Sequence, residues 1–398
     1  MNPAPTLTLL QTCVMAVLQA IAVVIFIFVL VPLTTFAERK VLGYLQQRLG
    51  ATRVASGLIG ITGGMNRGMW AMGKVPFLSI LRGLPFFVAD ALKLFLKEDI
   101  VPAKADRIVF LIAPAISAAA SLLVFAVVCF YPGTLFTFPA WVPVIGNCPL
   151  SGSIADINVG LLFMTSIGSV GIYGIVLGGW ASNSKYPLLG GLRSAAQMVS
   201  YEVPLAVSLL TPVVLSGSLN FREMMRILSG LPPLNASGSG LTQMPLLAAI
   251  PLFLGFFIYF TCGFAETNRM PFDMPEAENE LVAGFHTEYS GMRFSFFYLA
   301  EYTNMVVVAS LASALFLGGH YLLPFGLQTF IPEGIPILGR PNLLFFLAKI
   351  FCLLFVFIWV RGTLPRYRYD QIMAVAWKYL LPLAIGNLFL AALIRYCC

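Results

Sequence analysis

The stretch AETNRMPFDMPEAENELVAGFHTEYSG, residues 265–291, concentrates acidic side chains in an otherwise apolar chain. Charged residues make up 10% of the 398 positions, yet this stretch holds six of the 17 carboxylates. These acids are Glu266, Asp273, Glu276, Glu278, Glu280 and Glu288. When neighbouring carboxylates are sheltered from water, their repulsion keeps some of them protonated near neutral pH. Such a row can hold protons and pass them on.

Part of this stretch has the pattern of a helix start. Asp273 suits an N-cap, and Pro275 and Glu276 suit the first turn. In the helix that follows, Glu276 and Glu280 lie one turn apart on one face and repel each other. A simple solvated acidic loop is the other interpretation, but apolar residues interleave with the acids, namely Leu281, Val282, Phe285, Tyr289 and Phe294.

Two further acids lie inside apolar segments. Glu202 is about 13 Å into segment 194–216, and Glu301 is about 10 Å into segment 294–318, at 1.5 Å per helical residue. An ionised side chain at such a depth costs at least about 2.5 kcal/mol, which makes both residues functional candidates. The other interpretation is structural pairing with an arginine; the nearby arginines are Arg193, Arg269 and Arg293.

The composition shows what must position these acids. The chain is 59% hydrophobic with a mean hydropathy of +0.88, far more apolar than a soluble domain. Apolar stretches of about 20 residues recur, and the alternating pattern of a membrane β-barrel does not. We therefore predict an all-α polytopic membrane protein with one domain, 1–398. The eight predicted spans are 10–36, 108–131, 157–180, 194–216, 244–264, 294–318, 342–361 and 375–395.

The basic residues predict the orientation of these spans. Eighteen of the 24 Lys and Arg residues lie in the connections 37–107, 181–193, 265–293 and 361–371. The positive-inside rule places these connections in the cytoplasm and both termini on the opposite, periplasmic side. The net charge of +7 reflects this bias, and it does not indicate nucleic-acid binding because no basic cluster with interleaved aromatic residues occurs.

The first cytoplasmic connection contains two distinct parts. GLPFFVADALKLFLKED predicts an amphipathic helix at the membrane surface, with Asp90, Lys93 and Lys97 on its polar face. The segment 56–82 is rich in Gly and Met and has no acid. It is either a second surface helix or a loose insertion. Its basic and aromatic residues suit contact with anionic lipid, and we predict a collar that faces lipid or a partner subunit rather than part of the proton path.

No residue pattern predicts a metal or a nucleotide on this chain. The seven cysteines are scattered without a C-x-x-C pair. His286 and His320 are 34 residues apart and are more typical of hydrogen-bonding residues than of metal ligands. Gly57, Gly60 and Gly63 do not lie between a predicted strand and a predicted helix, as the glycines of a nucleotide-binding turn would. Any redox cofactor is therefore expected on other chains.

The acidic stretch, followed by FYLAEYTNM, resembles the membrane-embedded H subunit of respiratory complex I, the proton-pumping NADH:quinone oxidoreductase. Further motifs agree in the same order, and together they extend over nearly the whole chain, 37–383. They are AERKVLGYLQQRLG, ADALKLFLKED, GWASNSKYPLLGGLRSAAQMVSYEVP and RGTLPRYRYDQIMAVAWKYLLPL.

The resemblance implies eight transmembrane helices, the membrane end of a quinone chamber, and a buried acidic path toward the pumping subunits. By motif match, the proton path comprises Glu202, Glu266, Asp273, Glu276, Glu278, Glu280, Glu288 and Glu301. The quinone chamber is lined around Glu38, Arg39, Arg48, Asp90, Lys93 and Arg269, with Arg361 and Arg366 on the same side. This sequence departs from the family pattern at two places: Ala51-Thr52 stands where the family has Pro-Asn, and the segment 56–82 is inserted. The resemblance therefore does not imply the shape of the chamber entrance.

The same resemblance implies a translocase subunit without a complete redox site of its own. Quinone is the substrate, shared with neighbouring subunits, whereas FMN, NADH and iron–sulfur clusters belong to partner subunits. The expected partners are the hydrophilic quinone-site subunits, the other membrane subunits and lipid, with no nucleic acid. The expected location is the bacterial inner membrane rather than the mitochondrial one.

Two other functions fit parts of the sequence. The membrane anchor of a hydrogenase or formate hydrogenlyase would keep the first loop and some acids but use no quinone. A stand-alone ion transporter would need no partner surface. The ENELVAGFHTEYSG and AEYTN matches favour complex I, and the large cytoplasmic loops favour docking to partners.

Overall fold

The computed structural model describes residues 9–48, 50, 85–131, 134–137, 148–229, 246–273, 282–322 and 341–397. In this part of the chain, eight helical segments are long and apolar enough to cross a membrane. They are α1 (Leu9–Leu45), α4 (Arg107–Val124), α5 (Gly160–Ala181), α6 (Lys185–Ser216), α8 (Ala249–Glu266), α10 (Gly291–Leu315), α11 (Leu343–Thr363) and the continuous helix α12–η5–α13. The predicted class of polytopic helical membrane protein is confirmed, and so is the number of spans.

Shorter elements connect the spans. They are α3 (Pro85–Leu96), β1 (Thr134–Thr137), β2 (Pro149–Ser151), α7 (Phe221–Leu228) and the turns η2 (Leu246–Ala248) and η3 (Gly284–His286). The last span consists of α12 (Tyr369–Ala374), the π-helical turn η5 (Val375–Leu380) and α13 (Leu381–Cys397). The strands pair antiparallel, with Thr137 opposite Pro149, and form a small sheet between α4 and α5.

Several helix ends differ from the predicted spans. The first span continues from 36 to Leu45, so Glu38 and Arg39 lie on a helix and not in a loop. At 37 residues, α1 is about 55 Å long, and a bilayer core of about 30 Å leaves its last turns free to carry charge. Helix α4 ends at Val124 instead of 131, and beyond it the backbone N–H of Phe130 donates to the carbonyl of Gly152, next to β2.

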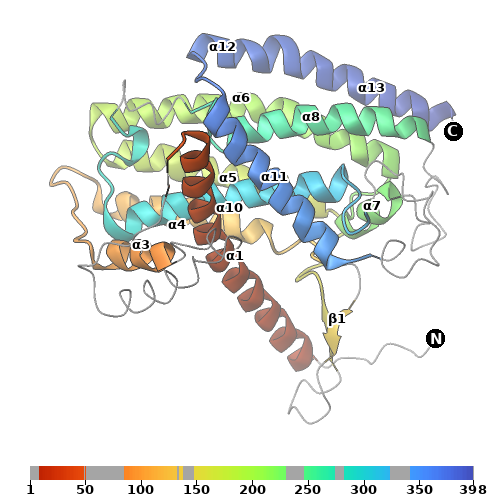
Figure 1. Cartoon of the computed structure of the whole chain (residues 1–398), viewed down its shortest axis with the longest axis horizontal. Coiled ribbons are helices and arrows are strands. Elements are labelled where there is room, and N and C mark those ends of the chain that lie inside the picture. Colours follow the sequence, from red (N-terminus) through yellow and green to blue (C-terminus); the bar gives the residue numbers. More distant parts are fainter. Residues whose placement is uncertain are drawn as a thin grey trace.

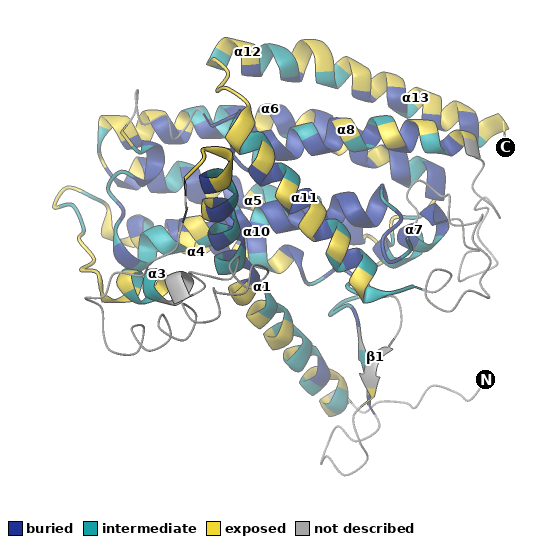
Figure 2. Ribbon diagram, viewed as in Figure 1, coloured by how far each residue is buried: buried dark blue, intermediate teal, exposed yellow. Residues whose placement is uncertain are grey.

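The most buried helices are those that carry the candidate acids. Figure 2 shows α8 and α10 largely buried, whereas α11, α12 and α13 present exposed residues. In Figure 1, α12 and α13 run along α6 and α8, and α11 crosses the bundle on the side of α1. Aromatic side chains fill the contact between α8 and α11, where Phe357 lies 5.0 Å from Phe260 and 4.1 Å from Phe264 between ring centroids.

The amphipathic helix is present as α3, with Asp90 and Lys93 on it. The exposed side chains of Phe95 and Leu96 at its end suit contact with a membrane surface. The predicted insertion 56–82 lies outside the described residues. So do Glu276, Glu278 and Glu280, together with most of the helix predicted to start at Asp273.

A lysine fixes the chain just after the C-terminal end of α10. Lys349, on α11, donates to the backbone carbonyls of Leu317, Gly319 and Tyr321, with 3.2 Å to Gly319. These carbonyls lie in the chain that leaves α10, and partly buried carbonyls need a donor because an unmade hydrogen bond away from water is costly. Nearby, His320 Nε2 lies 2.6 Å from the Phe130 carbonyl, as expected for a hydrogen-bonding histidine.

Replacing Lys349 with Met is expected to lower the stability of the assembled protein by about 2 kcal/mol. The variant keeps the apolar stem but leaves partly buried carbonyls without a charged donor. The thermal midpoint of the purified complex measures the loss. Lys378→Met is the control, because Lys378 is exposed on the last span and its removal should change stability by less than about 0.5 kcal/mol. Equal midpoints for both variants would contradict this role of Lys349.

Candidate functional site

The carboxylate of Glu38 is buried at the end of α1, and donors from three other elements converge on it. Arg269 Nη1 lies 3.2 Å from both carboxylate oxygens, and the hydroxyl of Tyr302, on α10, donates at 2.7 Å. Arg361, on α11, forms an ion pair with the same group. Buried carboxylates need such partners, because an unpaired charge away from water is very costly.

Arg269 connects this carboxylate with a second one. Its Nε lies 2.5 Å from Glu301 Oε1, and its guanidinium lies 4.2 Å from the ring centre of Tyr302. Burial by itself disfavours the charged guanidinium, but Glu301, Tyr302 and Glu38 outweigh it and raise the pKa of Arg269 well above its usual value. Arg269 is therefore a permanent cation between two acids. We call Glu38, Arg269, Glu301, Tyr302 and Arg361 the Arg269 cluster.

The turn after α8 places Arg269 in this position. Helix α8 ends at Glu266, and Asn268 takes the left-handed conformation, with φ of 50°, which reverses the chain. Two buried residues of α6 hold the turn. Gln197 donates to the carbonyls of Ala265 at 2.8 Å and Phe272 at 2.7 Å, and Ser194 accepts from Asn268 at 2.9 Å.

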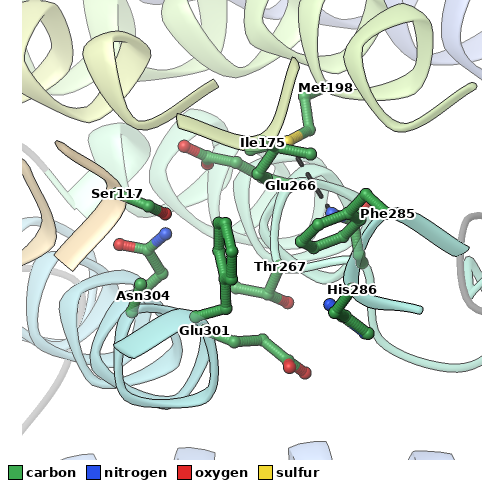
Figure 3. Close-up of a pocket in the computed structure, with 12 residues that line it drawn as sticks. Ser117, Ile175, Met198, Glu266, Thr267, Phe285, His286, Glu301 and Asn304 are labelled. Atoms are coloured by element: carbon green, nitrogen blue, oxygen red, sulfur yellow. Dashed lines mark hydrogen bonds between the residues drawn. The ribbon is translucent and has the colours of Figure 1, made fainter. Parts of the chain in front are cut away.

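Two cavities join the Arg269 cluster to the interior of the bundle. The Glu202 cavity, of about 240 Å³, is lined by Glu202, Glu266, Asn304 and side chains of α5, α6, α8 and α10. The smaller Glu301 cavity, of about 30 Å³, is lined by Glu266, Asn304, His286 and Glu301 among others (Figure 3). Glu266 and Asn304 line both, so the acids follow one another from Glu202 through Glu266 to Glu301.

Both cavities can hold water. A water molecule needs about 10–15 Å³ of such space and two or more polar partners. The Glu301 cavity offers two carboxylates with Ser117, Thr267 and Asn304, and the Glu202 cavity adds Thr165 and Ser169. Water in these cavities would give protons a route between carboxylates that do not touch.

The sequence comparisons identify the family. The chain matches the family model described as NADH dehydrogenase over residues 18–392. It is 45% identical to the NADH-quinone oxidoreductase H subunit 2 of Koribacter versatilis, over 94% of this chain and 95% of the relative. The chain belongs to the family of the NADH-quinone oxidoreductase H subunits.

Other relatives agree with this assignment. The H subunit of Paramagnetospirillum magneticum is 42% identical, over 94% of this chain and 91% of its own. The H subunit of Magnetococcus marinus is 40% identical, over 96% of this chain and 92% of its own. The resemblance found in the motifs is thereby confirmed: this is the family of a membrane subunit of NADH-quinone oxidoreductase, complex I.

In this member of the H-subunit family, the acids of the predicted proton path fall into separate groups. Glu202, Glu266 and Glu301 line the two cavities. Asp273 instead pairs with Arg366 at 3.1 Å, and Glu288 is partly buried in the turn before α10. The arginine pairing considered for the intramembrane acids occurs at Glu301, with Arg269, whereas Glu202 lines a cavity together with Ser169.

The residues predicted for the quinone chamber also fall into two groups, one buried and one exposed. Glu38 and Arg269 belong to the buried Arg269 cluster. Arg39, on α1, pairs with Asp90, on α3, at 2.8 Å, and these side chains are 50% and 37% exposed. Lys93 is exposed one turn further along α3, and Arg48 is exposed in the turn after α1. The half-exposed pair contributes less than about 1 kcal/mol to stability.

Sequence reasoning missed several residues that position the site of this family member. Tyr302 bonds Glu38 and stacks under Arg269, and Asn304 lines both cavities. Ser194 and Gln197 hold the turn that carries Arg269. The one sequence signal for these residues is that each is a polar residue inside an apolar segment. Such a residue is expected to hydrogen bond with a buried partner. That signal does not reveal the partner.

Proposed function

We propose that this chain forms the membrane end of the quinone chamber of complex I and couples quinone reduction to proton translocation through its buried carboxylates. The observation that carries the proposal is the pair of cavities that share Glu266 and Asn304 and end at Glu301 of the Arg269 cluster. Three acids within or at the edge of the membrane line cavities that can hold water, and this arrangement suits proton transfer better than a structural role.

The chamber end lies at the Arg269 cluster and the surface next to it. Arg39, Arg48 and Lys93 give this surface a positive balance over Asp90, which suits an entrance through which the polar quinone headgroup passes toward the hydrophilic subunits. Reduction of a quinone to a quinol takes up electrons together with protons. Partner subunits supply the electrons, and the groups at this surface supply or exchange the protons.

The shared arginine explains how a change in the chamber reaches the cavities. Arg269 forms ion pairs with Glu38 and Glu301 at the same time. When a change at the quinone end draws Arg269 toward Glu38, Glu301 loses part of its counter-charge and can take up a proton. A proton taken up at Glu301 then moves through water to Glu266 and on to Glu202.

This role sets the chain in a larger assembly. We place it as a multi-pass protein of the bacterial inner membrane, with both termini on the periplasmic side and the basic connections in the cytoplasm, as the positive-inside rule predicts. Hydrophilic subunits carrying FMN and iron–sulfur clusters dock on the cytoplasmic side. Further membrane subunits receive the protons that pass Glu202.

Replacing Glu202 with Gln tests the proposal. The amide keeps the shape of the side chain but cannot bind and release a proton, so coupled quinone reduction and proton pumping should fall about tenfold. Electron transfer from NADH to an artificial acceptor should not change, because it does not use this path. Both rates are measured on the assembled complex in sealed vesicles.

The control for this experiment is Glu223→Gln. Glu223 hydrogen bonds with Ser218 at 2.9 Å near the start of α7 and lines neither cavity. The control should pump protons at the parent rate. The proposal fails when Glu202→Gln, assembled in normal amount, reduces quinone and pumps as the parent does.

A further inference from the structure

A histidine that the proton path does not include lies on the wall of the Glu301 cavity. His286 is 7% exposed and lines this cavity together with Glu266 and Glu301 (Figure 3). It is one of two histidines in the chain. The other, His320, bonds to the Phe130 carbonyl and lines neither this cavity nor the Glu202 cavity.

Aromatic rings hold His286 in this position. Its ring centre lies 4.1 Å from that of Phe285, 5.6 Å from Phe294 and 6.4 Å from Phe297. The turn η3, which carries His286, packs closely on α6. Gly190 of α6 has no side chain, and a Cβ atom there would clash with the backbone of Gly284. The imidazole is thus fixed at the cavity, and the rings shield it from bulk water.

The charged groups around the cavity are mainly acids. Glu266 on α8 and Glu301 on α10 line it directly, and Glu301 is paired with Arg269. Helix α5, which packs on η3, carries no charged residue. The other ionisable or charged residues on the elements packed around η3 are Tyr173 on α5, Lys185, Tyr186, Arg193, Tyr201 and Glu202 on α6, Arg293, Tyr298 and Tyr302 on α10, and Glu288 and Tyr289 in the following turn.

The chemistry of histidine suits a carrier between these acids. Its imidazole changes charge near neutral pH, and its two nitrogens allow it to accept a proton at one and release a proton from the other. A carboxylate can do neither as readily when a cation such as Arg269 holds it ionised. The polar cavity has room for the water that would link His286 to both acids.

We propose that His286 is a proton-carrying residue of the Glu301 cavity, exchanging protons through water with Glu301 and Glu266. The imidazole accepts a proton at one nitrogen and becomes an imidazolium, and it returns to the neutral form when the proton passes to a carboxylate. No electron moves in this step. The inference rests on the proposed function, because it adds a member to the same path.

The test compares two substitutions with different consequences for packing. His286→Gln keeps a polar side chain of similar reach, whereas His286→Phe keeps an aromatic ring among the three phenylalanines. Neither can carry a proton. We expect both to lower coupled quinone reduction and pumping about tenfold and to change the pH profile of that rate. Reduction of an artificial acceptor should not change.

His320→Gln is the matched control, because it removes the other buried histidine and should keep the pH profile of the parent. The inference is overturned when either His286 variant pumps with the parent's rate and pH profile while Glu202→Gln is impaired. A normal His286→Phe beside an impaired His286→Gln would show a packing role instead, which also overturns it. When Glu202→Gln is normal too, the proposed function itself fails. The smaller His286→Asn decides the outcome where the other two variants do not assemble.

Discussion

Replacing Arg269 with Met is expected to abolish quinone reduction by the assembled complex, with a loss of at least about a hundredfold. Arg269 is 5% exposed and pairs with both Glu38 and Glu301. Without it, Glu301 loses this buried counter-charge, and Glu38 keeps Arg361 and the hydroxyl of Tyr302. Breaking a buried ion pair by removing one partner costs about 3–5 kcal/mol. Quinone-reductase and artificial-acceptor rates, together with the amount of assembled complex, measure the effect.

Two comparisons make this result specific. Arg368→Met removes an arginine that is 82% exposed and lies 3.8 Å from Asp370, so it should have little effect. Arg269→Lys keeps the charge but lacks the planar fork that reaches two acids at once, so it should restore only part of the activity. Normal quinone reduction by Arg269→Met would remove the Arg269 cluster from the mechanism.

Replacing Gly190 with Val is expected to prevent assembly of most of the protein. A Cβ atom at this position would lie 2.8 Å from Gly284 Cα and 2.9 Å from Phe285 N, both backbone atoms that cannot turn aside. Helix α6 and the turn η3 would have to separate, and the valine methyl groups add to the clash. Overpacking of this kind costs about 3 kcal/mol or more. The quantity to measure is the amount of complex in the membrane.

Gly386→Val is the matched control for that variant. Gly386 also lies in a transmembrane helix, α13, but a Cβ atom there would have no neighbour within 4 Å. The same change of residue should therefore leave assembly near the parent level. Equal amounts of the two assembled variants would show that α6 and η3 tolerate separation, and that their close approach does not shape the Glu301 cavity.

The pattern of the sequence predicted the membrane architecture well, because it depends on local properties. About 20 apolar residues in a row span a bilayer wherever they occur, so the eight spans could be counted without a structure. Helix ends were less predictable. A charged residue such as Glu38 looks like the start of a loop, but a helix can continue beyond the bilayer and carry it.

The candidate site was predictable only in part. Glu202 and Glu301 were found because charge inside an apolar segment is costly and therefore conspicuous. Asn304 and Tyr302 lie one to three positions from Glu301 and carry no such signal. Their importance comes from what they face: the two cavities for Asn304, and Glu38 with Arg269 for Tyr302.

The sequence by itself determined the class of this protein, its eight spans and its membership of the H-subunit family, because these depend on composition, periodicity and motifs that are read along the chain. Only the tertiary structure decided which charges share one counter-ion. Glu38 and Arg269 are 231 positions apart, and Glu38 and Arg361 are 323 apart. Charges that are buried must pair, but the packing of α1, α8, α10 and α11 selects the partners, and no local pattern records that choice.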